Sequence, residues 1–142
     1  MGQKLYYIDT CIWLNLINKE GDETKGIPYW KIAEDLINLC RKNEIIGITS
    51  SVVLKELKYK LNKDMKCYFL RKYSFIKIIT ANESDYLFAR TVEKVNDYQI
   101  GFGDCLHIAI SKRMGAILVT RDNDLIRVGS KYIFLKRPEE TF

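Results

Sequence analysis

The stretch LVTRDND, residues 118–124, joins an apolar run that is typical of a buried strand to two aspartates. Short apolar runs of this kind alternate along the chain with longer stretches of helical period. Strands separated by helices need crossover connections, which produce a mainly parallel sheet with helices on both faces. We therefore predict an α/β fold: a single three-layer domain over residues 1–142 with about five strands.

Glycines, prolines and helix-capping residues divide the chain into these elements. Strands are expected at residues 4–8, 45–48, 75–79, 116–120 and 132–135. Helices are expected at residues 11–18, 29–42, 51–61, 65–73, 82–97 and 104–114. Ser50 or Ser51 can cap the third of these helices, and Gly115 is expected to end the last one.

Length and composition indicate an ordinary globular protein. A chain of 142 residues can bury a core, and 47% hydrophobic with 29% charged residues excludes a disordered or fibrous chain. The four cysteines form no C-x-x-C pair, so reduced thiols are expected rather than a zinc knuckle or a disulfide framework. Asp9 interrupts the apolar run near the N-terminus, which argues against a signal peptide or a membrane span. We expect a cytoplasmic protein.

The positive charge is concentrated in one part of the chain. The formal net charge is +5, but residues 41–77 hold ten Lys and Arg against three Asp and Glu, a local net charge of +7. The rest of the chain therefore carries −2. A basic segment beside a slightly acidic body is typical of a protein that holds a polyanion. A lysine-rich face that only contacts water remains an equal alternative.

Three aspartates are expected at one edge of the sheet. Ligands bind at the carboxyl ends of parallel strands, because loops and the positive ends of helices meet there. Asp9 directly follows the first expected strand, and Asp122 follows the fourth. Asp104 lies in the first turn of a helix whose sequence CLHIAI is apolar on nearly all sides, so this helix should be buried. Its N-terminus is then expected to face the same edge.

Glu56 is a fourth candidate on geometric grounds. At about 100° per residue, the apolar side chains of its helix form one arc, and Glu56 lies at the border of this arc between Val52 and Val53. Lys55 and Lys58 point to the opposite side in the same projection. Glu56 can therefore reach from the rim of the core into a cleft.

Four converging carboxylates need compensation for their charge. Two unit charges about 5 Å apart repel by about 3 kcal/mol at an effective dielectric constant of about 20, and each further pair adds to this. Either several carboxylates keep their protons or a cation is bound. Carboxylate oxygens prefer the hard ions Mg²⁺ or Mn²⁺ to zinc. Such an ion polarises a phosphoryl oxygen and generates hydroxide for in-line attack.

Each acid taken alone also has a structural interpretation. Asp122 or Asp124 can cap a short final helix through residues 125–127. Asp104 can cap its own helix, and Glu56 can balance nearby lysines in water. The metal site is favoured because four acids fall where one cleft requires them.

Three stretches surround these acids: YIDTCIWLNL at residues 7–16, SSVVLKEL at 50–57 and GDCLHIAISKRMGAILVTRDNDLIRVG at 103–129. Together they resemble the PIN-domain ribonucleases, and especially the VapC-type toxins of prokaryotic toxin–antitoxin pairs. The resemblance runs over residues 4–135. It implies that four acids hold the metal and cleave single-stranded RNA, namely Asp9, Glu56, Asp104 and Asp122. It further implies that Asp124 assists the metal, that Thr10 and Thr120 support the acids, and that the partners are a second copy and an antitoxin protein.

Other residues near the motifs are candidates for further roles. His107, the only histidine, lies one turn beyond Asp104, and a satisfied core histidine is favoured over a site contact. Candidates for RNA binding are Lys55, Lys58, Lys60 and Arg121. Four aromatic residues interleave with basic ones, namely Tyr59, Tyr68, Phe69 and Tyr73. They suit base stacking, but core or dimer contacts are favoured.

The sequence thus predicts a Mg²⁺- or Mn²⁺-dependent endoribonuclease that cleaves single-stranded or loop RNA as the toxin of a toxin–antitoxin pair. Two alternatives remain open. One is a nuclease of RNA processing that has no antitoxin. The other is a catalytically inactive PIN-like module that binds metal or RNA.

Overall fold

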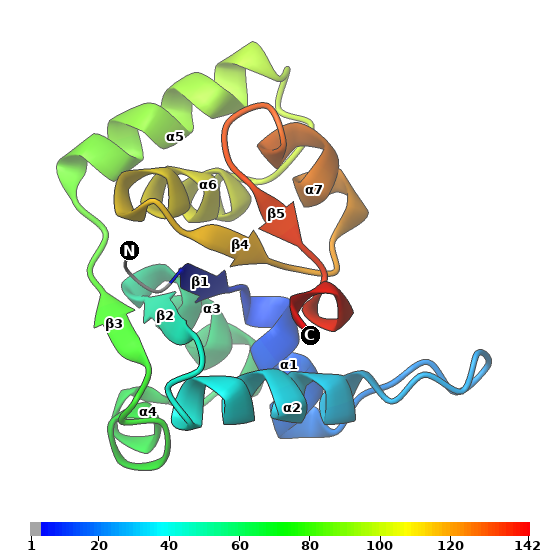
Figure 1. The fold of residues 1–142 in the computed structure, drawn as a ribbon. Helices are drawn as coiled ribbons and strands as arrows, with labels where there is room; N and C mark the ends of the chain where they lie inside the picture. Colours follow the sequence, from blue (N-terminus) through cyan, green and yellow to red (C-terminus); the bar gives the residue numbers. More distant parts are fainter. Residues whose placement is uncertain (1–3) are drawn as a thin grey trace.

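A five-stranded, all-parallel sheet lies at the centre of the computed structural model, which describes residues 4–142 (Figure 1). The strands are β1 (Leu5–Ile8), β2 (Ile46–Ser50), β3 (Lys77–Ile79), β4 (Ile117–Val119) and β5 (Leu135–Lys136). Their order across the sheet is β3-β2-β1-β4-β5. The predicted α/β fold with a parallel sheet is confirmed. Residues 1–3 of the predicted domain lie outside the described residues.

Seven α-helices connect or follow these strands in the described part of the chain. They are α1 (Thr10–Asn18), α2 (Tyr29–Arg41), α3 (Ser51–Leu61), α4 (Lys66–Lys72), α5 (Glu83–Val95), α6 (Phe102–Met114) and α7 (Asn123–Gly129), with a 3₁₀ helix η1 (Pro138–Thr141) near the end. Capping residues set several boundaries as expected. Ser50 caps α3 by accepting a bond from the N–H of Val53, and Gly115 ends α6 in the left-handed conformation, at φ 63°.

The connections explain why helices cover both faces of the sheet. From β1 to β2 and from β2 to β3 the chain moves one way, whereas from β3 to β4 it returns across β1 and then continues outward to β5. Because parallel crossovers are right-handed, the two directions place helices on opposite faces. Accordingly α1 packs on α2 on one side and α5 on α6 on the other (Figure 1). The strand order reverses between β1 and β4, where open α/β sheets bind ligands.

Several predicted boundaries were wrong by two residues or more, among them the end of β2 at Ser50 rather than 48 and the end of α5 at Val95 rather than 97. The fifth strand is Leu135–Lys136 rather than 132–135, because the N–H groups of Tyr132 and Ile133 bond to the carbonyl of Gly129 in the turn after α7. The third strand begins at Lys77, since Ile76 is held in a turn by a bond to Tyr73. The helix predicted from residue 104 begins two residues earlier, at Phe102.

The core holds α6 on all sides, as its apolar sequence predicted. Every residue from Cys105 to Ser111 is buried. On the other face, Trp13 of α1 is fully buried against the rings of Phe69 and Tyr73. These two aromatic residues therefore belong to the core, which is the alternative that the sequence favoured over base stacking. The burial of residues 105–111 of α6 fixes the position of the N-terminus of this helix.

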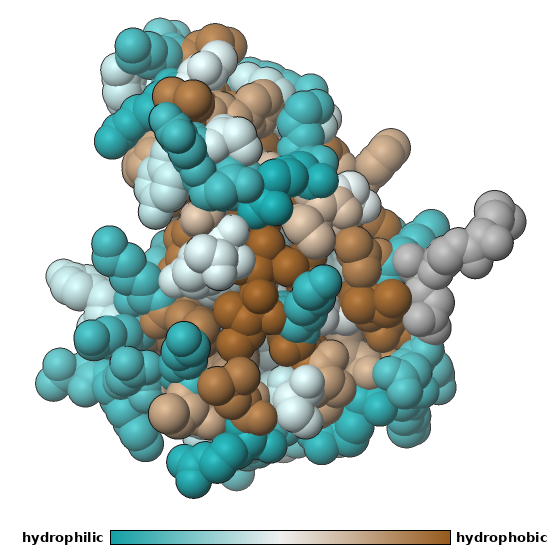
Figure 2. Space-filling view, turned by 90° about the vertical axis from the view of Figure 1, so that its left-hand side faces the viewer, coloured by the Kyte–Doolittle hydropathy of each residue, from teal (hydrophilic) through white to brown (hydrophobic). Residues whose placement is uncertain are grey.

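Some apolar side chains nevertheless reach the surface. On the face shown in Figure 2 they gather in a central area with hydrophilic side chains around it. The large exposed apolar side chains include Leu87, Val95 and Phe134. Within residues 4–142, no helix combines the length and the apolar character needed to cross a lipid bilayer. The four cysteines are all free, as expected.

Candidate active site

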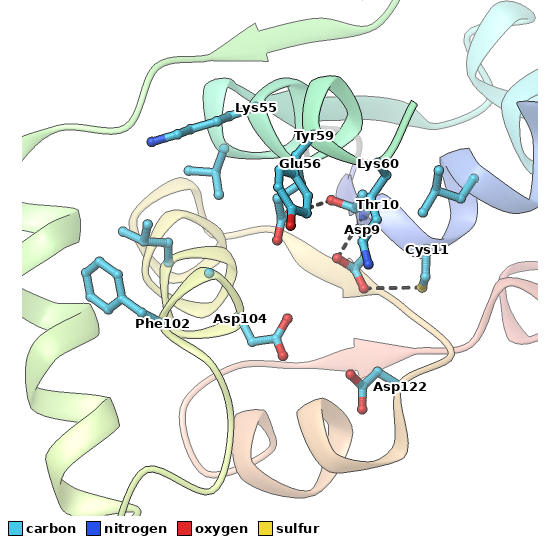
Figure 3. A pocket seen from close by; sticks show the side chains of 14 residues that line it. Asp9, Thr10, Cys11, Lys55, Glu56, Tyr59, Lys60, Phe102, Asp104 and Asp122 are labelled. Atoms are coloured by element: carbon cyan, nitrogen blue, oxygen red, sulfur yellow. Dashed lines mark hydrogen bonds between the residues drawn. The ribbon is translucent and has the colours of Figure 1, made fainter. Parts of the chain in front are cut away.

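A pocket of about 660 Å³ lies at the carboxyl ends of the strands where the strand order reverses. Side chains from α1, α3, α6 and the loop after β4 line it (Figure 3). All four predicted acids are among them: Asp9, Glu56, Asp104 and Asp122. Segments separated by up to about a hundred residues of chain thus bring their carboxylates to one pocket.

Asp9 is the most firmly held of the four acids. It is 5% exposed and forms the N-cap of α1, where its Oδ1 accepts a bond of 2.8 Å from the backbone N–H of Thr10. Its Oδ2 accepts a bond of 2.7 Å from the hydroxyl of Thr120 and one of 3.2 Å from the thiol of Cys11. Burial raises the pKa of this thiol well above its usual range, so Cys11 acts as a donor and not as a thiolate.

Glu56 reaches the pocket from α3 and is fixed through one of its oxygens. Its Oε1 accepts a bond of 2.6 Å from the hydroxyl of Thr10 and lies 2.7 Å from Nε2 of His107. Burial acts to raise the pKa of Glu56, but the bonds from His107 and Thr10 and the charge of His107 outweigh it, so the pKa is lowered. Glu56 is therefore an ionised carboxylate at neutral pH, and the charge of Lys60 also contributes to its lowered pKa.

Asp104 is the acid whose protonation is most affected by the site. It is the third residue of α6, and Gly101 occupies the capping position, so the interpretation of Asp104 as a helix cap was wrong. Its pKa is raised to about 7, first by burial and then by the neighbouring carboxylates of Asp9, Asp122 and Glu56, whereas His107 acts in the opposite direction. Asp104 is therefore the acid of this pocket that is close to half-protonated at neutral pH.

Asp122 caps a helix and also lines the pocket. Its Oδ1 caps α7 by accepting bonds from the N–H groups of Asp124 and Leu125, at 2.9 and 3.2 Å. The same side chain lines the pocket. Thr120 links it to the first strand, because its hydroxyl donates to Asp9 and accepts a bond of 3.1 Å from the N–H of Asp122. A capping residue can therefore also be a site residue.

Four predicted site residues do not line the pocket, namely Asp124, Arg121, Lys58 and Thr120. Asp124 is exposed, and its carboxylate lies 3.4 Å from Arg127 on the surface of α7. Arg121 lies with its guanidinium 3.9 Å from the ring centre of Tyr29 and bonds to both carboxylate oxygens of Glu139 at 3.0 Å. Its side chain is only 14% exposed, so Arg121 is occupied by contacts within the chain.

The basic residues of α3 divide between two faces. Lys55 and Lys60 line the pocket together with Tyr59, whose side chain is 85% exposed. Lys55 is exposed, as the projection indicated, and it also lines the rim of the pocket. Lys58 is exposed and does not line the pocket. Figure 3 shows Lys55, Tyr59 and Lys60 on the α3 side, opposite Asp104 and Asp122.

His107 was correctly predicted to be buried and satisfied, but its partners are site residues. It has no exposed surface, and Nε2 lies 3.5 Å from Asp9 Oδ1 in addition to its contact with Glu56. Burial lowers the pKa of His107, but the bond to Glu56 and the charges of the surrounding acids outweigh this and raise it. Its spacing of three residues from Asp104, one helical turn, was the sequence signal for this contact.

The donor set suits a hard cation, although it is open. Carboxylate oxygens are the ligands that Mg²⁺ and Mn²⁺ prefer, and a cation would offset the repulsion that helps to raise the pKa of Asp104. Within residues 4–142, no three His, Cys, Asp or Glu side chains close around one point in this conformation. The four acids therefore fit such an ion in their chemistry and line one pocket, but they do not form a closed cage.

A family model described as "PIN domain" matches residues 6–131. Among solved structures, the chain is similar to VapBC2 from Rickettsia felis bound to a DNA fragment from its promoter, with 25% identity, a TM-score of 0.65, and coverage of 94% of this chain and 98% of that one. VapBC from Salmonella typhimurium bound to DNA has 16% identity and a TM-score of 0.67 over 96% and 99% of the chains. A toxin–antitoxin complex from Klebsiella pneumoniae has 14% identity and a TM-score of 0.64 over 94% and 97%. The last two show likeness of fold alone. No curated protein matches the chain.

Proposed function

The chain belongs to the PIN domain family, a family of nucleases, and from this premise we propose that it is a Mg²⁺- or Mn²⁺-dependent endoribonuclease. Its substrate is single-stranded or loop RNA, and its role is that of the toxin in a cytoplasmic toxin–antitoxin pair. One observation carries the proposal: four acids from four distant segments line a single pocket at the reversal of strand order. These acids are Asp9, Glu56, Asp104 and Asp122.

The pocket supplies the groups that phosphodiester cleavage needs. The four acids hold the divalent ion, which when bound provides Lewis-acid chemistry at the scissile phosphate. Thr10 and Thr120 keep the carboxylates of Glu56 and Asp9 oriented through bonds of 2.6 and 2.7 Å, so little reorganisation is needed on binding.

The pocket rim supports an RNA substrate with unpaired bases. Lys55 and Lys60 are placed to contact phosphates, and the exposed ring of Tyr59 between them offers a stacking surface. A base is available for stacking only where it is unpaired, which favours single strands and loops over duplexes. Arg121 and Lys58 are left out of this part of the proposal, because neither lines the pocket.

The partner assignment rests on the similar structures. VapBC2 from Rickettsia felis, at 25% identity, is a complex of a toxin with its antitoxin. The exposed apolar side chains of Figure 2 support a surface that another protein chain covers. We expect a small reading frame next to this gene. Its product should co-purify with the chain and suppress cleavage. A homodimer would be seen as twice the chain mass of 16.6 kDa in solution.

A cleavage assay tests the enzymatic part. The purified chain, with and without Mg²⁺ or Mn²⁺, is given unstructured and duplex RNAs beside Asp9→Asn and the matched variant Asp97→Asn, which changes an exposed aspartate outside the pocket. We expect cleavage of the unstructured RNA only with metal, and a loss on the order of 10²-fold in Asp9→Asn. Equal cleavage by Asp9→Asn and Asp97→Asn would show that a contaminant cuts the RNA.

The open spacing of the acids favours a second candidate, a binding module without turnover. In that case Mg²⁺ raises the melting temperature of the chain, and Asp9→Asn abolishes this rise, but no RNA is cleaved. A melting series run beside the cleavage assay separates the two functions.

A further inference from the structure

His107 lies where three elements of the site meet. Its Nε2 is 2.7 Å from Oε1 of Glu56 on α3 and 3.5 Å from Oδ1 of Asp9 after β1. The imidazole is fully buried, so it cannot contact RNA directly. Any influence of His107 on the reaction must pass through the two carboxylates.

The second ring nitrogen of His107 is held as firmly as the first. Nδ1 lies 2.7 Å from the hydroxyl of Tyr7, a residue of β1 with no exposed surface. The same hydroxyl lies 2.6 Å from Oγ of Ser50, which also accepts the capping bond of 3.2 Å from Val53 N–H. A continuous hydrogen-bond chain therefore runs from the start of α3 through β1 and α6 back to the middle of α3.

This chain fixes one oxygen of Glu56 and leaves the other available. A carboxylate only accepts hydrogen bonds, so Nε2 of His107 donates to Oε1, and the hydroxyl of Thr10 donates to the same atom. No hydrogen bond within residues 4–142 is made to Oε2. This oxygen points toward Gly103, a pocket residue whose added Cβ would lie only 2.9 Å from it.

We propose that His107, held by Tyr7 and Ser50, is a positioning residue that binds Oε1 of Glu56 and thereby presents Oε2 to the pocket. The functional consequence of this inference rests on the proposed function, in which Oε2 is the atom that Glu56 offers to the metal. The hydrogen-bond chain itself does not depend on that function. Outer groups of this kind orient ligand oxygens in metal sites and affect both affinity and rate.

The contact between His107 and Glu56 can be tested without metal or RNA. The chain has a single histidine, so the ¹⁵N-labelled imidazole of tag-free protein gives one assignable set of signals. We expect an Nε2 proton protected from exchange in the wild type, its loss in Glu56→Ala, and a shifted Nδ1 signal in Tyr7→Phe. Identical imidazole spectra in the wild type and Glu56→Ala would overturn the proposal even if the protein cleaves RNA.

Steady-state cleavage then separates a positioning role from a purely structural one. His107→Leu is expected to lower kcat by about 10- to 100-fold with KM for RNA nearly unchanged. His107→Gln keeps an N–H near the position of Nε2, so it should recover part of that loss, and Tyr7→Phe should lower kcat less than His107→Leu. If His107→Leu does not fold, the other two variants carry the test.

Tyr132→Phe is the matched control. It removes the hydroxyl of a partly buried tyrosine, which is bonded to Asn96 at 3.0 Å and lies away from the pocket. We expect this variant to retain kcat. Equal values of kcat in Tyr7→Phe, His107→Gln and Tyr132→Phe would refute the positioning role. A wild type that cleaves no RNA would instead refute the proposed function, and the imidazole spectra would still decide whether His107 holds Glu56.

Discussion

Gly103 shows, at the scale of the single residue, how closely the pocket is built around Glu56. A Cβ at this position would lie 2.9 Å from Oε2 of Glu56, closer than side-chain contacts normally allow. Glu56 cannot move away freely, because Thr10 and His107 hold its other oxygen. Glycine is therefore needed here for space rather than for backbone conformation.

Gly103→Ala should displace Oε2 of Glu56 and thereby lower kcat by about 10- to 100-fold. The melting temperature should change little, because the Glu56 side chain that must shift is at the surface of the pocket. Gly101→Ala is the matched control, since a Cβ there meets no atom within 4 Å. It removes a favourable capping glycine and should cost only a little stability. Equal kcat values in the two variants would show that the position of Oε2 is unimportant.

Asp104 makes the stability of the metal-free protein depend on pH. Its pKa of about 7 in the folded chain lies above the ordinary value of 3.8, so the folded state binds a proton that the unfolded state has already lost. This contribution to stability is complete below about pH 4 and disappears as the pH rises through about 7. We expect the melting temperature, measured in a chelator, to fall across this range because of Asp104.

Asp104→Asn should flatten this part of the pH profile and raise the melting temperature near pH 8, while abolishing cleavage. Asp97→Asn should keep the wild-type slope, because Asp97 lies outside the pocket. If Asp104→Asn and the wild type lose stability in parallel between pH 4 and pH 7, another group causes the dependence.

At the scale of the element, α3 forms one side of the pocket. It presents Lys55, Glu56, Tyr59 and Lys60 within two turns, so helical geometry fixes the spacing of the proposed metal ligand from the proposed phosphate and base contacts. Ser50 caps this helix and also belongs to the chain that holds His107. The start of α3 therefore connects helix formation to the arrangement of the site.

Tyr59→Ala is expected to raise KM for single-stranded RNA about tenfold with kcat unchanged, because the loss of one base-stacking contact weakens binding without changing the carboxylates. Phe134→Ala removes an aromatic ring that is 82% exposed but lies outside this pocket, and should leave KM unchanged. A Tyr59→Ala variant with wild-type KM would assign this ring to another contact, such as a second protein chain.

The elements that the sequence placed wrongly are short and depend on their neighbours. β5 has two residues, and they form a strand only because Leu118 and Val119 of β4 pair with them. Local propensity favoured the aromatic run at 132–135, but a turn bonded to Gly129 uses its first residues. The long helices have their own hydrophobic periods, so they could be located from the sequence, and the capped α3 and α5 begin within one residue of the predicted positions.

At the scale of the whole molecule, the distribution of basic residues sets how the proposed RNA binding should depend on salt. Residues 41–77 carry a net charge of +7, but of the four predicted basic contacts only Lys55 and Lys60 line the pocket. Each phosphate contact to a single strand contributes about 0.7 to the slope of log affinity against log salt. The contribution of the pocket lysines can therefore be measured.

Lys55→Gln/Lys60→Gln should reduce that slope by about 1.4, measured with uncleaved RNA in a chelator. Lys63→Gln/Lys66→Gln removes two exposed lysines of the same basic segment outside the pocket, and should reduce the slope less. Equal reductions in both double variants would mean that RNA is held by the segment as a whole and not at the pocket.

The sequence by itself determined the alternation of strands and helices, the parallel sheet, and the placement of Asp9 and Asp122 at its ligand-binding edge. These features follow from hydrophobic periodicity and helix capping, which depend on residues only a few positions apart in the chain. Only the tertiary structure decided that His107 bonds to Glu56, that Lys55 reaches the pocket and that Arg121 is occupied by Tyr29 and Glu139. The physical reason is that these contacts join side chains far apart in the chain, whose partners are fixed by packing and not by their neighbours in sequence.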